Sequence, residues 1–342
     1  MTLMDTVEAP PKRRRIPKWV IPAIGYTISG ASLVSVFWKF SYAQLGQDLR
    51  KLDWKLVALA IAIEISVYFF DAWRWKVLVK PVGGPSFALC LQAVFVGLFA
   101  NDVLPARAGE LVRCFLLSYE TKVPISLSFT SDFILRIMDG IWIVIIYLLV
   151  TFQIGSHRVI TDVMWAFSGG VVVISALTLF VLFRRHHAHH FVKNTSWAAR
   201  FIHLLEEIHR LGHWPELRAA LGISAFYWLA QALAVWALLR ADNFDLGLSA
   251  AGFLLVVKAI FTLIQVAPAN VGAYQQAVMY ALTLLLSEHS PSQSFAEIMF
   301  WFLSLPVAVG GAIAVAFAGV DITALHKRAH DARETGKLDG LA

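Results

Sequence analysis

The sequence has few charged residues and almost no cysteine. Only 15% of its 342 residues are Asp, Glu, Lys or Arg, whereas 58% are hydrophobic and the mean hydropathy is +0.66. Soluble domains carry about 25% charged residues, so this composition excludes a water-soluble enzyme. The two cysteines, Cys90 and Cys114, lie in apolar stretches, which excludes a disulfide framework and a cysteine metal site.

Apolar runs of membrane-spanning length recur along nearly the whole chain. They cover residues 21–37, 56–73, 86–104, 105–118, 130–152, 162–183, 219–239, 250–267, 271–286 and 296–320. A helix needs about 20 mostly apolar residues to cross the hydrocarbon core of a bilayer. The sequence therefore predicts an all-α, polytopic integral membrane protein with about six to eight spans.

Two neighbouring pairs of these runs lack a polar connection. Residues 86–118 are interrupted only around Asn101–Pro105, and residues 250–286 only around Pro268–Gly272. Pro and Gly break helices, and irregular backbone is tolerated at membrane depth only where it is buried in protein or lines a cavity. We therefore expect each pair to form a broken or re-entrant helical hairpin.

Basic residues divide the polar segments into two groups. Eighteen Lys and Arg fall in 11–18, 74–80, 184–218 and 327–337, and six fall in 39–55, 153–161, 240–249 and 287–295. The positive-inside rule places the first group, and with it both termini, in the cytoplasm. Under that constraint the two hairpins enter from opposite faces, an inverted arrangement typical of transporters. The pI near 9.3 thus reflects membrane orientation, and no nucleic acid partner is expected.

Three regions follow from this pattern. Residues 1–18 form a cytoplasmic basic N-terminus, 19–320 a membrane translocase domain and 321–342 a cytoplasmic polar tail. Within the domain, apolar residues of 191–217 recur at helical spacing, which predicts an amphipathic helix on the cytoplasmic surface. The four histidines within 186–190 lie next to no carboxylate or cysteine, so we expect an interfacial loop and neither a metal site nor a cofactor.

Ionisable side chains inside the apolar runs are candidates for function, because each costs about 2.5–3.5 kcal/mol at a helix centre. Arg107, Glu110 and Arg113 stand three residues apart and fall along one side of a helix. An Arg-Glu-Arg network leaves one positive charge for a phosphate or another anionic headgroup, which arginine binds in bidentate geometry. The alternative is an internally neutralised network that only holds the hairpin together.

A second charged face follows on the run that starts near Thr130. Asp132, Arg136 and Asp139 lie at i, i+4 and i+7, on one side of a helix. Their net charge is negative, so they could neutralise the positive charge of the first group. A structural clamp and a direct role in substrate binding both remain open.

The second hairpin offers neutral polar groups instead of charges. Asn270, Gln275 and Gln276 follow the break at Pro268, where freed backbone groups need a polar cavity or a ligand. We expect these amides to contribute to substrate binding, and a simple helix-loop-helix turn is the alternative.

The run at 56–73 carries Glu64, which lies deep enough to be a proton-coupling carboxylate. Asp71 is expected at the membrane interface, paired with Arg74. The neighbouring Trp73 and Trp75 are expected in an aromatic belt.

These motifs resemble a known family. Residues 101–113, 135–139 and 268–276 are similar to successive signatures of the flippase-like family that includes the transmembrane region of lysylphosphatidylglycerol synthase. The resemblance covers roughly residues 20–320 and implies an all-helical inner-membrane domain. Family members are associated with moving aminoacylated phosphatidylglycerol, polyprenyl-linked saccharides or hopanoid-type lipids.

The resemblance assigns the functional core to Arg107, Glu110, Arg113, Arg136 and Asp139. Gln275 or Gln276 stands where some members carry Glu, which argues against an identical coupling mechanism. Without a soluble aminoacyl-transferase domain after residue 320, we expect no synthesis of lysylphosphatidylglycerol by this chain.

The resulting hypothesis is a lipid transporter, or flippase, and not an enzyme. It moves an anionic or zwitterionic lipid across a bacterial-type inner membrane: a phospholipid, an aminoacyl-phospholipid or a polyprenyl-phosphate-linked lipid. Its expected partners are the lipid, a second copy of the chain or a lipid-biosynthetic enzyme. The alternatives are a membrane-embedded transferase that uses Glu110 with Asp102, and a scaffold for a lipid-modifying enzyme.

Overall fold

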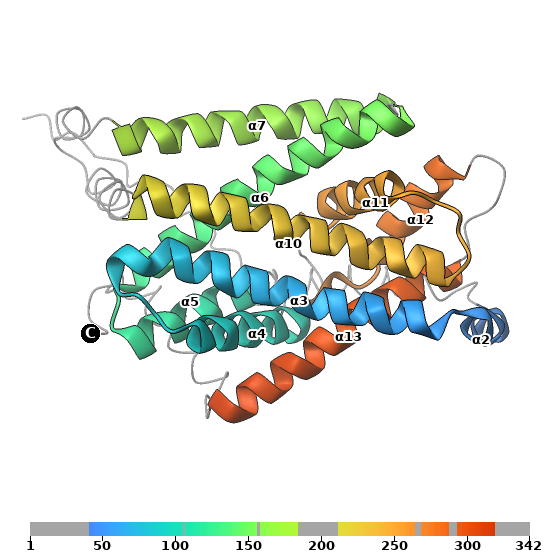
Figure 1. The fold of residues 1–342 in the computed structure, drawn as a ribbon, viewed down its shortest axis with the longest axis horizontal. Helices are drawn as coiled ribbons and strands as arrows, with labels where there is room; N and C mark the ends of the chain where they lie inside the picture. Colours follow the sequence, from blue (N-terminus) through green and yellow to red (C-terminus); the bar gives the residue numbers. More distant parts are fainter. Residues whose placement is uncertain are drawn as a thin grey trace, which may run out of the picture.

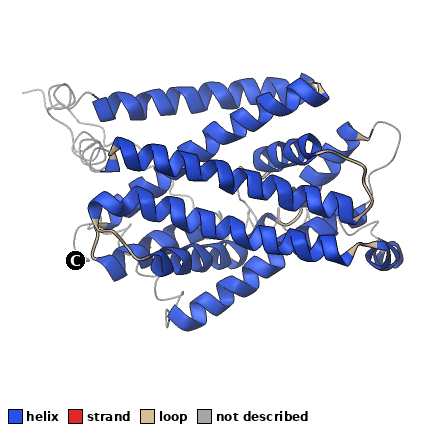
Figure 2. Cartoon of the chain, in the orientation of Figure 1, coloured by secondary structure: helices blue, strands red, loops and turns tan. Residues whose placement is uncertain are grey.

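A computed structural model describes residues 41–104, 107–155, 158–183, 211–263, 268–286 and 293–318. Within these ranges all regular structure is helical, with ten α-helices and two short 3-10 helices (Figure 2). The all-α prediction is confirmed. The apolar run at 21–37, the histidines at 186–190, most of the predicted interfacial helix and the tail lie outside the described residues.

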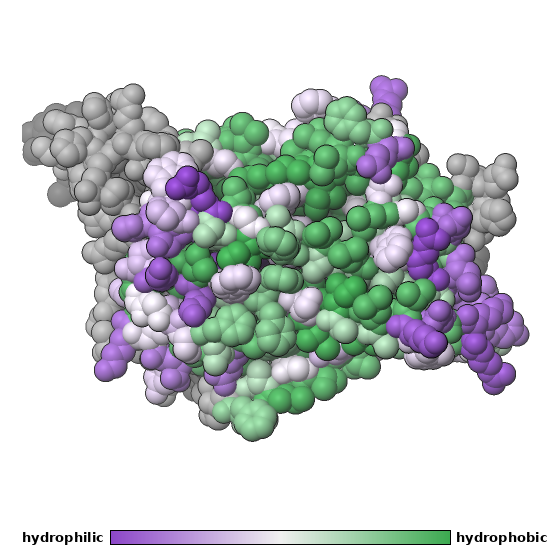
Figure 3. Space-filling view, viewed as in Figure 1, coloured by the Kyte–Doolittle hydropathy of each residue, from purple (hydrophilic) through white to green (hydrophobic). Residues whose placement is uncertain are grey.

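Five of the described helices are long and apolar enough to cross a membrane. They are α3 (Trp54–Val79), α6 (Ile125–Ile154), α7 (Arg158–Phe183), α10 (Trp214–Ala241) and α13 (Gln293–Ala318). Apolar residues cover the middle of the face shown in Figure 3, and hydrophilic residues gather at its two ends. This is the surface of a polytopic membrane protein, as predicted. The predicted number of six to eight spans includes the undescribed run at 21–37.

Four shorter helices form two pairs. α4 (Phe87–Val103) packs against α5 (Ala108–Thr121), and α11 (Leu248–Phe261) packs against α12 (Ala273–Leu285). At 1.5 Å per residue they reach about 20–26 Å, less than the roughly 30 Å of a hydrocarbon core. The pairs lie toward opposite ends of the molecule (Figure 1). The chain therefore breaks near both predicted positions, although α11 ends at Phe261 instead of 267.

The long helices α3 and α10 hold the molecule together. They pack along each other at its centre (Figure 1), and each contributes to two apolar cores. One core joins the start of α3 and the end of α10 to α6, α7, α11, α12 and α13, and the other joins the end of α3 and the start of α10 to α4, α5 and α6. α2 (Tyr42–Lys51) is a polar helix before α3, and the 3-10 helix η1 (Lys80–Val82) follows α3. The two short pairs are thus fixed to one central scaffold.

Two glycines bring α4 and α5 into backbone contact. A Cβ atom at Gly109 would collide with the carbonyl oxygen of Gly97 and lie 2.7 Å from Oδ1 of Asn101. The Gly109 N–H donates a hydrogen bond of 2.8 Å to the same Asn101 oxygen. Any side chain at position 109 would push apart two backbones, which cannot move aside as a flexible side chain can.

Gly109→Ala is therefore expected to separate α4 from α5 and to destabilise the protein by more than the 1–3 kcal/mol that is about typical of an overpacked core. The readout is the melting temperature of the detergent-purified protein, followed by loss of the monodisperse size-exclusion peak. Gly169→Ala is the matched control, because a Cβ there meets no atom within 4 Å. Equal melting temperatures for the two variants would contradict this account of the packing.

Candidate functional site

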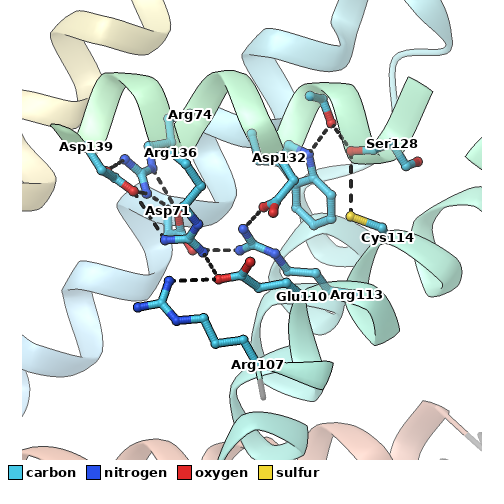
Figure 4. A network of polar contacts seen from close by, with 12 residues as sticks. Asp71, Arg74, Arg107, Glu110, Arg113, Cys114, Ser128, Asp132, Arg136 and Asp139 are labelled. Carbon is cyan, nitrogen blue, oxygen red and sulfur yellow. Dashed lines mark hydrogen bonds and ion pairs between the residues drawn. The ribbon is translucent and has the colours of Figure 1, made fainter. Parts of the chain in front are cut away.

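Eight charged side chains form one network between α3, α5 and α6 (Figure 4). It contains four arginines and four carboxylates: Asp71, Arg74, Arg107, Glu110, Arg113, Asp132, Arg136 and Asp139. Their formal charges cancel. The network joins both charged groups that the sequence predicted, and α3 adds one residue of each sign.

The deepest part of the network is built around Arg74, which is 1% exposed. Its guanidinium binds Asp71 at 2.7 Å (Nη2 to Oδ1) and forms a second ion pair with Asp139. Its Nη1 also donates to the hydroxyl of Ser224 at 3.3 Å, and its plane lies 4.1 Å above the ring of Tyr227. Two carboxylates and an aromatic face thus replace the water that a buried guanidinium loses.

Arg113 is the second buried arginine. It forms ion pairs with Asp132 and with Asp71, the latter at 3.4 Å, and it lies 5.1 Å from the ring centre of Trp75. Arg113 therefore turns toward α3 and α6. The expected Arg-Glu-Arg row contains the Arg107–Glu110 contact, whereas the partners of Arg113 come from other helices.

The network has an open edge made by Arg107, Glu110 and Arg136. Their side chains are 33%, 23% and 37% exposed. One oxygen of Glu110, Oε1, accepts from Arg107 at 3.4 Å and from Arg136 at 3.2 Å. Both distances exceed the 2.7–2.9 Å that is about usual for charge-assisted hydrogen bonds. A single carboxylate oxygen thus bridges two partly exposed guanidinium groups at long distances, and Arg136 has a second ion pair with Asp139 at 3.3 Å.

The breaks of the two hairpins meet beside this edge. Arg107, the residue before α5, has a left-handed backbone (φ 53°, ψ 35°), and its Nη2 donates to the carbonyl of Thr262 at the end of α11, at 2.9 Å. At the other break, Ala269 and Asn270 also have positive φ, within the 3-10 helix η2 (Pro268–Asn270), which packs against α4. Such conformations cost about 1–2 kcal/mol per non-glycine residue, so both breaks store strain.

A polar cavity of about 220 Å³ lies between the two hairpins. The charged and amide side chains that line it are Glu64, Asn101, Asp102, Gln231, Lys258 and Asn270. The cavity therefore receives polar groups from both hairpins and from α3 and α10. Asn101 joins it to the first hairpin, because its side chain also holds the start of α5.

The predicted amide group of the second hairpin divides between different environments. Asn270 lines the cavity. Gln275 is buried and caps the start of α12, where its Oε1 accepts from the Gly272 N–H at 2.8 Å. Gln276 is exposed. The structure thus brings Glu64 and Asn270 to one cavity and the six charged residues to the network, and it places Gln275 and Gln276 outside both.

The expected position of Asp71 and Arg74 at the membrane interface stays a prediction, whereas Trp75 is not part of an exposed aromatic belt. All three are buried, and the Trp75 indole donates to Ser131 at 2.9 Å, whereas Trp73 alone of the two tryptophans is exposed. The pairing of Asp71 with Arg74 is confirmed. A signal for their burial existed in the sequence, since Glu64, Asp71 and Trp75 fall on one helical face.

Three further polar residues carry no sequence signal of comparable strength. Tyr227 and Ser224 of α10 contact Arg74, and Glu297 of α13 is buried with its Oε2 accepting from Trp301 at 3.2 Å. Ser224 and Tyr227 stand three residues apart on one face of α10, a spacing that could have marked them, whereas Glu297 is a single carboxylate in an apolar helix.

Glu110 and Asp102, the two carboxylates that a transferase would use, lie in different environments. Glu110 is engaged by Arg107 and Arg136, and Asp102 lines the cavity. In the part of the chain that the structure describes, no group of three or more His, Cys, Asp or Glu is arranged to hold a metal ion.

Residues 23–311 match the family model described as the lysylphosphatidylglycerol synthase TM region. The chain belongs to this family. The matched range includes both hairpins, the network and the cavity, so the lysylphosphatidylglycerol synthase TM fold contains all of the candidate site. The resemblance inferred from the motifs is thereby confirmed.

Curated relatives of this family member are UPF0104 membrane proteins of archaea. One from Methanocaldococcus jannaschii is 22% identical over 56% of this chain and 82% of its own length. A second protein of that organism is 31% identical over 24% of this chain and 26% of its own. One from Methanothermobacter thermautotrophicus is 28% identical over 32% and 33%. The names describe these relatives as membrane proteins and assign no activity to them.

Arg74→Ala tests the buried half of the network. It leaves Asp71 and Asp139 without their main partner, and the loss of one member of a buried ion pair costs about 3–5 kcal/mol. We expect a large fall in melting temperature. Arg74→Met combined with Asp139→Asn, which removes one charge of each sign, is expected to recover part of that loss. A double variant less stable than Arg74→Ala would contradict the charge-balance account.

Proposed function

We propose that this family member is a lipid translocase that moves an anionic or zwitterionic lipid across the membrane. The observation that carries the proposal is the pair of partly exposed guanidinium groups, Arg107 and Arg136, held by one oxygen of Glu110 beside the hairpin breaks. The candidate cargo is a phospholipid, an aminoacyl-phospholipid or a polyprenyl-phosphate-linked lipid. All three present a phosphate group.

In this mechanism the phosphate binds where Glu110 now bridges the two arginines. A phosphate offers several strong acceptor oxygens, and arginine binds it in bidentate geometry, so it competes well with a carboxylate held at 3.2 and 3.4 Å. The acyl or prenyl chains stay in the bilayer. Arg113, buried between Asp71 and Asp132, serves to fix α5 to α3 and α6, and Arg136 takes the phosphate contact instead.

The arrangement of the hairpins supports alternating access. α4–α5 and α11–α12 are each too short to span alone, lie toward opposite ends of the molecule and meet at their breaks (Figure 1). Re-entrant hairpins of inverted orientation place helix N-termini and free backbone groups at a site near the bilayer midplane. We infer that the breaks before α5 and α12 are that site.

The loops support one orientation. The basic-rich segment 74–80 and the start of α10 lie at one end of the molecule, and the basic-poor segments 153–161 and 240–249 lie at the other (Figure 1). We place the first end in the cytoplasm. We propose a bacterial-type inner membrane as its location.

The transport test uses the full chain in liposomes, with fluorescent phosphatidylglycerol in one series and a labelled polyprenyl phosphate in another. The accessible fraction of label is followed after addition of a membrane-impermeant quencher. Arg107→Ala and Arg136→Ala are each expected to slow transfer about tenfold or more, since a charged hydrogen bond to phosphate is worth about 1.5–3 kcal/mol.

Arg218→Ala is the matched control, because this exposed arginine of α10 lies outside the network and the cavity. It should transfer lipid at the parental rate. The assignment fails if both network variants, at unchanged melting temperature, move both probes as fast as the parent.

A further inference from the structure

The cavity between the hairpins differs from the arginine network in its charge. Glu64 and Asp102 are carboxylates in its wall, and Lys258 is the one basic side chain among the described residues that line it. One negative charge is therefore left without a counter-charge there, whereas the network beside it is neutral. At membrane depth an unbalanced charge is expensive and needs a partner or a ligand.

The described polar side chains of the cavity form no ion pair with one another that would neutralise this negative charge. Glu64 is 7% exposed and accepts a hydrogen bond from the Tyr68 hydroxyl at 2.9 Å. The Lys258 ammonium lies 5.6 Å from the ring centre of Tyr274 and forms no direct ion pair with Glu64 in the described structure. The Asp102 carboxylate has neither an ion pair nor a hydrogen bond with any described residue.

An independent feature points to a ligand. Tyr274 is 8% exposed, and its hydroxyl is buried at the cavity without a hydrogen-bond partner among the described residues. A buried hydroxyl without a partner is uncommon in native structures. Here the phenol oxygen, two carboxylates and the amide of Asn270 offer oxygen acceptors around one small polar space.

We propose that this cavity binds one monovalent cation, H⁺ or Na⁺, and that its occupancy is coupled to lipid movement. A proton would bind on a carboxylate oxygen of Glu64 or Asp102, and Na⁺ would take the same oxygens together with neighbouring acceptors. Either cation cancels the unbalanced charge. The coupling part rests on the proposed lipid transport, whereas the cation site does not.

The hairpin breaks connect the cavity to the network. Asn101 lines the cavity and accepts from the Gly109 N–H in the first turn of α5, next to Glu110. The carbonyl of Thr262 accepts a hydrogen bond from Arg107. The hydroxyl and the N–H of Thr262 both donate to the carbonyl oxygen of Lys258. A change in cavity charge therefore acts on residues that position Arg107 and Glu110.

The cation site is tested first without lipid transport. We expect the parental protein to melt at a higher temperature when choline is replaced by Na⁺, or when the pH falls from about 8 to about 6, because a cation that binds the native state stabilises it. Glu64→Gln and Asp102→Asn each remove the unbalanced charge, so the response to the cation should be lost in both. Asp162→Asn, an exposed carboxylate of α7, should respond as the parent does.

The coupling is tested in the liposome assay with the membrane potential clamped. With one proton per lipid, a gradient of one pH unit should accumulate the transported probe about tenfold on one side. A Na⁺ gradient in a separate series distinguishes the two cations. Both carboxamide variants should equilibrate the probe without accumulating it.

The possible failures are separate. The cation site is overturned if neither Na⁺ nor the lower pH raises the melting temperature of the parental protein. It is also overturned if the rise in melting temperature persists in both carboxamide variants. Equal lipid distribution under either gradient, with normal equilibration, overturns the coupling and leaves lipid transport standing. A cation response without any lipid transfer overturns the proposed function and its coupling, and keeps the site.

Discussion

Charge balance in a low-dielectric environment is the constraint on which the rest of the structure depends. Arg74 and Arg113 could not be buried among apolar helices without their carboxylate partners, because an unpaired buried charge costs several kcal/mol. These arginines and their partners come from α3, α5 and α6, so the balance is reached only when these helices have assembled. The network is thus a condition for the tertiary structure as well as a candidate binding site.

The network is graded from a fixed interior to an adaptable edge. Arg74 and Arg113 are enclosed by carboxylates, aromatic rings and a hydroxyl. Arg107 and Arg136 are partly exposed and share one distant oxygen, with one further contact each, to Thr262 and to Asp139. Such a gradient suits a site that must bind and release a charged group. The interior preserves the geometry when the edge exchanges partners.

The sequence predicted the features that depend on neighbouring residues, such as helix breaks. It did not predict which side chains from distant parts of the chain contact one another. Helix breakers located both hairpins because Pro and Gly act on their own neighbourhood. The spacing of Arg107, Glu110 and Arg113 showed a shared face, but helical periodicity cannot say which helix that face meets. The burial of Arg74 inside the protein was missed because a basic residue between tryptophans has the pattern of a membrane interface. At the early end of α11 the Thr262 carbonyl accepts a hydrogen bond from Arg107 of the other hairpin, a contact that no local pattern marks.

The contact between Gly97 and Gly109 limits how the first hairpin can move. The two backbones are in direct contact, and the Asn101 side chain accepts a hydrogen bond from Gly109 across the pair. Because no flexible side chains lie between them, α4 cannot slide along α5. The two helices are therefore one rigid body. Any hinge must therefore lie at the ends of this pair of helices. At the break before α5, a rocking motion would have to break the hydrogen bond from Arg107 to Thr262.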